Sequence, residues 1–267
     1  MGQPISVSKI GPVGTFDPKL FSQMLQGLGS TFWWSRATEC PCGLEGSDQW
    51  RPNCSNCGGD GWWYVNPEVN RDRHTTDNYV AIQAAFANSS LSPSILEVFG
   101  HFGFGEAQIT VDGSMRVGHR DRFIGIEQEM PYSELILSAG PGTTIPVGKS
   151  GRTTAAQKTA LRYEPVFVNF IADEDEVLYY RQTDYRVLEP TLTEPGRLQW
   201  LSGRGPVVGK KLSVHYNCRP VWIVEGATYG IQVLQGPEET LKGTRKVRHL
   251  PSTFKVKLDY LTPQRGT

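Results

Sequence analysis

The stretch from position 38 to position 61, TECPCGLEGSDQWRPNCSNCGGDG, holds four of the five cysteines of the chain. Cys40 and Cys42 form one close pair, and Cys54 and Cys57 form a second. Four thiolates in two close pairs are a donor set typical of a tetrahedral Zn²⁺ site. A glycine follows each pair, which lets the backbone curl and donate amide hydrogen bonds to the sulfurs. The sequence therefore predicts a small zinc knuckle with Cys40, Cys42, Cys54 and Cys57 as its metal ligands.

The same four cysteines allow two other interpretations, namely two disulfides or four buried thiols without a metal. The first pair, Cys-Pro-Cys, is also tighter than the usual Cys-x-x-Cys spacing. A catalytic zinc is not expected, because four sulfur ligands leave no open position for water. So short a module cannot build a stable core alone, and a bound metal would supply its folding energy. Cys218 lies apart in a strand-like run and is predicted to be a buried thiol.

Composition favours a soluble globular protein with protein partners. The chain has 267 residues, of which 38% are hydrophobic and 20% charged, and its 27 basic residues balance 27 acidic ones. Zero net charge does not favour nonspecific binding of nucleic acid, whereas neutral proteins tend to associate with one another. There is no long apolar run and no secretory signal in MGQPISVSKIG, so we expect synthesis in the cytoplasm, where thiols stay reduced.

One short helix is predicted near the N-terminus, after an extended arm over residues 1–16. Asp17 and Pro18 start it, with a carboxylate at the N-cap and proline at the first helical position. Its apolar positions share one face, which is typical of a helix packed on a core. Docking onto a neighbouring subunit is the alternative for this face. The face consists of Leu20, Phe21, Met24, Leu25 and Leu28.

The rest of the chain predicts short strands, so the expected fold class is mainly β: a small zinc knuckle plus β-barrel or β-sandwich modules. Leu212–Tyr216 alternates as a half-buried strand does, and about 160–225 is expected to form a sandwich of immunoglobulin-like size. The polar segment 66–78 and the Gly-rich segment 139–160 are predicted to be linkers. The predicted domains are an arm and helix at 1–30, the knuckle at 31–66, a β-rich middle domain with a linker at 67–150, and a sandwich-like domain at 151–267.

Several other motifs do not amount to an active site. Pro146–Ser150 ends like a phosphate-binding loop, but Thr143 stands where that loop needs glycine. The acidic run Asp173–Glu176 is expected to be a solvated hairpin tip, and the basic cluster Arg245–His249 a solvated loop. The five histidines are scattered. We therefore predict no catalytic residues and no enzymatic activity.

Two groups of segments resemble a known class of proteins. Residues 34–42 and 53–61 resemble a knuckle found in structural proteins of tailed bacteriophages. Further segments are similar, in their order, to β-sandwich segments of head–tail connector or neck proteins. These further segments are residues 162–166, 180–185, 213–216 and the pair Arg219-Pro220.

The resemblance implies a virion structural protein that is assembled in the host cytoplasm and works as one copy in a homo-oligomeric ring. Its partners would be other neck, portal or tail proteins of the phage. No membrane is expected, and binding of nucleic acid is possible but not expected to be specific. Connector, tail terminator and baseplate component remain open, because the region 78–138 matches none of them. The competing function is a zinc-ribbon protein that binds nucleic acid through its Trp-rich knuckle. Against it, Arg36 and Arg51 of the knuckle are offset by nearby acidic residues.

Overall fold

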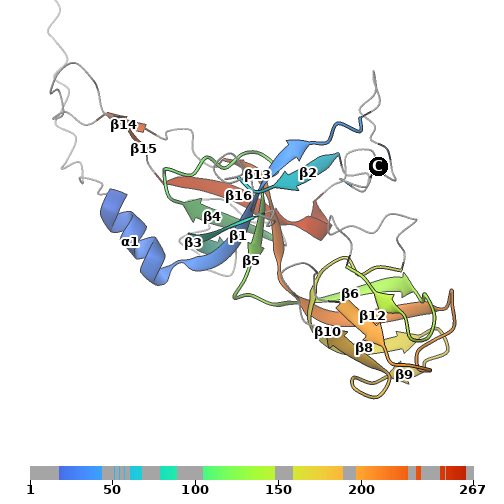
Figure 1. Cartoon of the computed structure of the whole chain (residues 1–267). Helices are drawn as coiled ribbons and strands as arrows, with labels where there is room; N and C mark the ends of the chain where they lie inside the picture. Colours follow the sequence, from blue (N-terminus) through green and yellow to red (C-terminus); the bar gives the residue numbers. More distant parts are fainter. Residues whose placement is uncertain are drawn as a thin grey trace, which may run out of the picture.

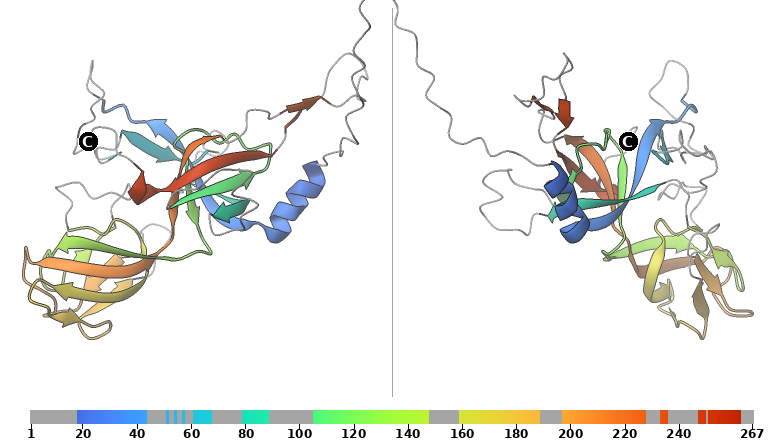
Figure 2. Two further views of the ribbon diagram at one scale, coloured as in Figure 1. Left: turned by 180° about the vertical axis from the view of Figure 1, so that it is seen from behind. Right: turned by 60° about the vertical axis from the view of Figure 1, so that its left-hand side comes forward.

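The computed structural model describes residues 18–43, 51, 54, 57, 61–67, 79–88, 105–147, 159–188, 197–227, 233–235, 247–249 and 251–262. Within these ranges the chain is mainly β with a single α-helix, and it forms two lobes (Figures 1 and 2). The predicted fold class is thereby confirmed. The predicted arm at 1–16 and nearly all of the predicted linker at 66–78 lie outside the described residues.

The first lobe is a closed barrel of six antiparallel strands. Its strands alternate between the interior and the outer face, as the period of two in a β-strand requires. The interior is filled with apolar side chains, among them the fully buried Phe32, Ile109 and Phe123. In spatial order, the strands are β1 (Ser30–Glu39), β3 (Val80–Asn88), β4 (Glu106–Val111), β16 (Ser252–Leu258), β13 (Val221–Ala227) and β5 (Arg122–Gly125), which pairs again with β1.

The second lobe consists of two small sheets around a core of its own. One sheet has the order β6 (Met130–Leu137), β12 (Lys211–Cys218), β8 (Pro165–Asp173), β9 (Leu178–Tyr179), and the other β10 (Tyr185–Leu188), β11 (Arg197–Trp200), β7 (Thr144–Ile145). The alternation predicted at 212–216 lies within β12, where Leu212, Val214 and Tyr216 are fully buried. Cys218 is buried in the same core, as predicted.

The strand pairings do not follow the predicted domain boundaries. The barrel takes strands from the segments 31–66, 67–150 and 151–267, and the second lobe takes β6 and β7 from 67–150. The second lobe is in fact inserted between two barrel strands, β5 and β13. The linker predicted at 139–160 includes β7, which pairs with β11. Periodicity shows that a segment is a strand but not which distant strand it pairs with. Domain boundaries placed at polar or Gly-rich segments therefore missed the insertion of the second lobe into the barrel.

Two smaller features complete the first lobe. The helix α1 (Pro18–Leu28) begins where predicted and packs on β3, and its Leu25 side chain is buried. The strand β2 (Trp62–Val65) pairs with the half of β1 that extends past the barrel. Separately, β14 (Val233–Gln235) and β15 (Val247–His249) pair with each other.

Polar and aromatic contacts join the two lobes. A short 3₁₀ turn, η2 (Asp259–Leu261), follows barrel strand β16. The Asp259 carboxylate accepts hydrogen bonds from the Arg162 guanidinium at 3.1 Å and the Tyr163 hydroxyl at 3.0 Å, both from the second lobe. Tyr260 packs against Tyr132 of β6, with the ring centres 5.6 Å apart. These contacts fix one lobe on the other.

Candidate metal centre

The four predicted ligands lie in the loop that connects β1 to β2. Glu39, the last residue of β1, pairs with Trp62, the first residue of β2. The two ends of the connecting loop therefore lie side by side. There the backbone N–H of Cys40 donates to the Gly61 carbonyl at 2.8 Å. The Cys54 N–H donates to the Arg51 carbonyl at 3.1 Å within the loop. The hairpin therefore brings both cysteine pairs back to the same place.

The structure brings Cys40, Cys42, Cys54 and Cys57 together, with their sulfur atoms all within 4.8 Å of one another. The Cys40–Cys54 sulfurs are 3.7 Å apart and the Cys42–Cys57 sulfurs 3.4 Å apart. A tetrahedron with Zn–S bonds of about 2.3 Å has S···S edges of about 3.8 Å, whereas a disulfide is about 2.0 Å long. None of the five cysteines forms a disulfide. The spacing thus fits a four-coordinate metal ion such as zinc.

The surroundings of the thiols define what the centre can do. Burial, followed by the neighbouring thiols, raises the pKa of Cys42 to about 12, and burial also raises the pKa of Cys40. Thiols of this kind keep their protons at neutral pH until a cation displaces them, so metal binding releases protons. With four sulfur donors, the centre can hold a metal as a structural cross-link between β1 and β2.

Five tryptophans lie within the segment 31–66 that was predicted to form the knuckle, and the structure places them in different environments. Trp34 belongs to the barrel rather than to the knuckle: it is buried in the barrel interior, where its indole stacks on Phe123. Trp33 points to the outer face of the barrel, stacks on Tyr79 with ring centres 4.4 Å apart, and has the Arg219 guanidinium 4.8 Å from its ring centre. Trp62 and Trp63 lie on β2, and Trp50 is outside the described residues. The Trp33 ring therefore already has two partners within the chain.

A buried carboxylate below the knuckle was not foreseen from the sequence. Asp121 accepts hydrogen bonds from the Trp34 indole N–H and from the backbone N–H groups of Ala37 and Gly118, each at 2.9 Å. Burial raises the pKa of Asp121, and these hydrogen bonds oppose the rise. The contacts tie β1 to the turn before β5 just where β1 leaves the barrel. The only local signal was an Asp at the end of a Gly-containing turn.

The acidic run Asp173–Glu176 lies at the turn between β8 and β9, where a solvated hairpin tip was predicted. Glu174, Asp175 and Glu176 are exposed, but Asp173 departs from the prediction because it ends β8 and is buried. The Asp173 carboxylate accepts from the Lys210 ammonium at 2.6 Å and from the Tyr179 hydroxyl at 2.9 Å. These partners, Lys210 first, lower the pKa of Asp173 to about 2. Its oxygens are thus engaged within the chain. In the loop-like motif Pro146–Ser150, only the first two residues are described.

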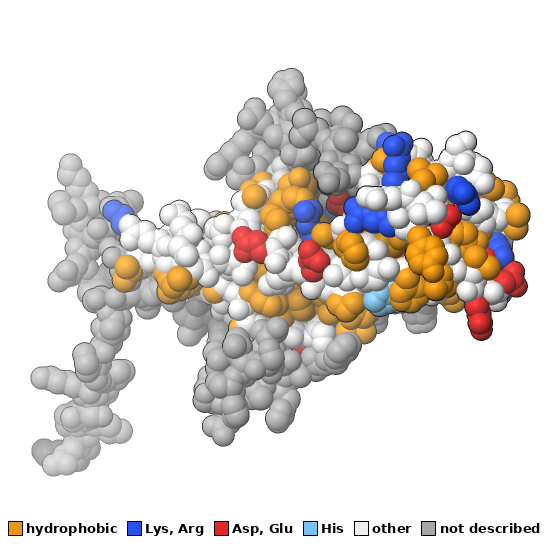
Figure 3. Space-filling view, turned by 90° about the horizontal axis from the view of Figure 1, so that it is seen from below, with side chains coloured by type: hydrophobic (Ala, Val, Ile, Leu, Met, Phe, Trp, Pro, Cys, Tyr) orange, Lys and Arg blue, Asp and Glu red, His pale blue; other side chains and the backbone are white. Residues whose placement is uncertain are grey.

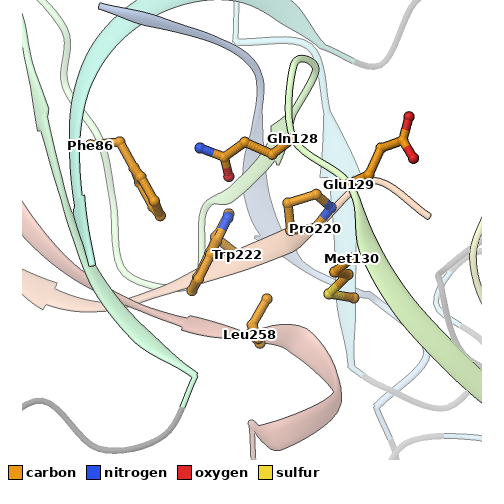
Figure 4. Close-up of a pocket in the computed structure, with 7 residues that line it drawn as sticks. All are labelled: Phe86, Gln128, Glu129, Met130, Pro220, Trp222 and Leu258. Carbon is orange, nitrogen blue, oxygen red and sulfur yellow. The ribbon is translucent and has the colours of Figure 1, made fainter. Parts of the chain in front are cut away.

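A cavity of about 500 Å³ lies where the chain passes between the lobes (Figure 4). The amide of Gln128 points toward the side where Phe86 and Trp222 lie, whereas the Glu129 carboxylate points away from them. The indole N–H of Trp222 has no hydrogen-bond acceptor among the described residues. It is lined by Phe86, Gln128, Glu129, Met130, Pro220, Trp222 and Leu258.

Comparison with known proteins leaves the chain without an assigned family. No protein-family model matches it, and no curated protein is significantly similar in sequence. No helix in the described ranges is both long and apolar enough to cross a membrane.

Proposed function

We propose that this chain is a non-enzymatic structural subunit of a tailed-bacteriophage particle. It acts in the neck or head–tail connector as one copy of a homo-oligomeric ring, and contacts other neck, portal or tail proteins. The observation that carries the proposal is the outward exposure of large apolar side chains on both lobes, although each lobe has its own filled core. The resemblance of the knuckle and strand segments to phage structural proteins supplies the kind of assembly.

Exposed apolar side chains on two separate lobes favour contacts between subunits. Soluble monomers rarely expose large contiguous apolar patches, and such patches usually mark interaction surfaces. A subunit with two different apolar contact surfaces joins its neighbours head to tail. Such contacts close into a ring when the rotation between neighbouring subunits permits. The exposed large apolar residues among those described are Leu20, Met24 and Leu28 on α1, Trp63 on β2, and Leu135, Val166, Phe167, Phe170, Val177, Leu178, Tyr180, Val207 and Val208 on the second lobe.

In this proposal the four-cysteine centre holds a structural Zn²⁺ ion. Cys40, Cys42, Cys54 and Cys57 would bind it, and it would pin the outer halves of β1 and β2 together. A subunit in a particle must keep its surface loops in one conformation, and a metal cross-link does this in a segment too small for its own core. Two buried carboxylates, Asp121 and Asp259, and the partly buried Glu134 are likewise bound to donors within the chain. These groups support an architectural role.

The test uses the phage that encodes the chain. Mass spectrometry of purified particles is expected to find the protein at a fixed ratio to the portal protein. Deleting the gene should give heads and tails that do not join, and a plasmid copy should restore them. Absence of the protein from purified particles would refute the proposal. Salt-sensitive binding of the purified protein to DNA, without such a defect, would favour the zinc-ribbon nucleic-acid binder instead.

A further inference from the structure

The helix α1 is held on the barrel with an apolar stripe facing outward. Leu25 is buried, and the Ser22 hydroxyl donates to the Asp112 carboxylate of the β4–β5 turn. Gly29 closes the helix with an N–H bond to the Leu25 carbonyl at 2.8 Å. Positions four apart lie on one face of a helix, so the exposed residues form one continuous stripe. They are Leu20, Met24 and Leu28, which are 65%, 43% and 85% exposed.

The surroundings of this stripe carry little charge. Its exposed neighbours Gln23 and Gln26 are amides, the first turn holds no acidic residue, and the last turn holds no basic one. Lys19 is the single charged residue of the helix. The stripe therefore fits an apolar surface in which polar groups are uncharged.

A surface of that kind covers the outer face of the sheet β6–β12–β8–β9. The strand register places three rows of side chains across its middle, and none of them contains Asp, Glu, Lys or Arg. Charge lies at the edge of the face: the next row pairs Leu137 with the exposed Lys211, and the Arg181 guanidinium lies 5.6 Å from the Phe167 ring centre. Phe170 stacks on His215 with ring centres 5.2 Å apart. Leu135 is 75% exposed, and Phe167, Phe170 and Leu178 are each between 44% and 49% exposed. The rows are Leu135, Ser213, Ala172 and Leu178; Ser133, His215 and Phe170; and Pro131, Asn217 and Phe167.

Within one copy the two surfaces do not meet. The helix is anchored on the barrel, whereas the sheet face belongs to the second lobe at the far end of the molecule (Figures 1 and 2). In the view from below, hydrophobic side chains gather over the second lobe (Figure 3). Each surface therefore needs a partner, and the chain itself offers the matching one.

Charge and size favour a pairing of these two surfaces in neighbouring copies. Neither the stripe nor the three rows contains a charged side chain, so their contact desolvates charge only at its edge, where Arg181 and Lys211 lie. An 11-residue helix is about 16 Å long, and four strands span about 14 Å between the outermost two. We infer that α1 of one copy docks across the outer face of the β6–β12–β8–β9 sheet of the next copy. This contact deepens the proposed function, on which it rests, by naming the surfaces that close the ring.

The small area of this contact limits its strength. One helix on one small sheet buries less than the roughly 800 Å² per partner of a standard interface. A single contact is therefore weak, and it becomes stable when every copy makes two of them in a closed ring.

The experiment uses two surface variants of the full chain. The helix variant carries Leu20→Asp and Leu28→Asp, the sheet variant carries Leu135→Glu and Leu178→Glu, and the matched control carries Val207→Asp, which is exposed and on neither surface. Sedimentation equilibrium measures association, and circular dichroism shows that each variant is folded. We expect the wild type and the control to associate with rising concentration, and each variant alone to associate at least about tenfold more weakly.

Mixing the variants decides the geometry. The helix variant keeps its sheet face and the sheet variant keeps its helix, so an equimolar mixture should form a 1:1 pair and nothing larger. A mixture that stays monomeric, a helix variant that associates like the wild type, or a wild type that is monomeric at about 1 mM would each overturn the inference. If the protein is present in particles and the mixture still fails to pair, this contact is wrong and the virion role stands.

Discussion

Removing the carboxylate of Asp259 is expected to destabilise the protein more than any single surface change, because it leaves a cation between the lobes. The carboxylate side chain is 7% exposed and the Arg162 side chain 17% exposed, with nitrogen and oxygen 3.1 Å apart. Breaking a buried pair by removing one partner costs about 3–5 kcal/mol. The Tyr163 hydroxyl loses its acceptor as well, which adds about 1 kcal/mol. Since Arg162 keeps some access to water, we expect Asp259→Ala to lower the free energy of unfolding by about 4 kcal/mol.

The comparison with two further variants tests the cause. Asp259→Asn keeps an acceptor for Tyr163 and should cost about 2–3 kcal/mol, because only the charge is lost. Replacing both partners, Arg162→Met with Asp259→Leu, removes the stranded charge and should cost less than about 1.5 kcal/mol. The free energy of unfolding is measured in urea by tryptophan fluorescence. An Asp259→Ala protein within 1 kcal/mol of the wild type, or a double variant as unstable as that single one, would refute the reasoning.

Three further predictions concern the metal, the acid limit and the arm. Protein purified without chelator should contain about one zinc ion per chain; Cys54→Ser should lose it while Cys218→Ser keeps it, and metal-free folded wild type would contradict this. Because Lys210 lowers the pKa of Asp173 to about 2, the stability that Asp173 contributes should be present above its ordinary pKa and be lost as pH falls through about 2; Asp173→Asn should remove that loss from an acid titration. Deleting residues 1–16 should leave folded protein that no longer enters particles, and normal incorporation would show that the arm is dispensable.

Local features of the fold were predictable from the sequence because their causes are local. The Asp-Pro start predicts where α1 begins, and the alternation at 212–216 predicts β12. The cysteine spacing predicts four sulfurs that the structure places within 4.8 Å. In each case the residues that decide the outcome lie within one turn, one strand or one loop.

The strand pairings that close the barrel could not be predicted, because they join distant segments of the chain. The strand β1 pairs with β5, and β4 pairs with β16, yet neither partner leaves a trace in the periodicity of the other. Trp34 illustrates the same limit. Its place next to the knuckle made it a neighbour of the cysteines, but the alternation along β1 turns it into the barrel toward Asp121. Which apolar side chains a protein leaves exposed, such as Leu28, also depends on packing rather than on pattern.

The insertion of the second lobe has a consequence for synthesis on the ribosome. When β5 has emerged, the nascent chain can form only an open sheet in the order β4, β3, β1, β5, with two unprotected edges and a bare apolar face. The strands that cover those edges, β13 and β16, follow only after the whole second lobe, whose own strands all lie between Met130 and Cys218. The second lobe, although it is synthesised after the first barrel strands, can therefore complete its fold before the barrel does. Until β13 and β16 emerge, the barrel remains an open sheet. During that wait the open sheet is the part of the molecule most exposed to aggregation and most in need of a chaperone.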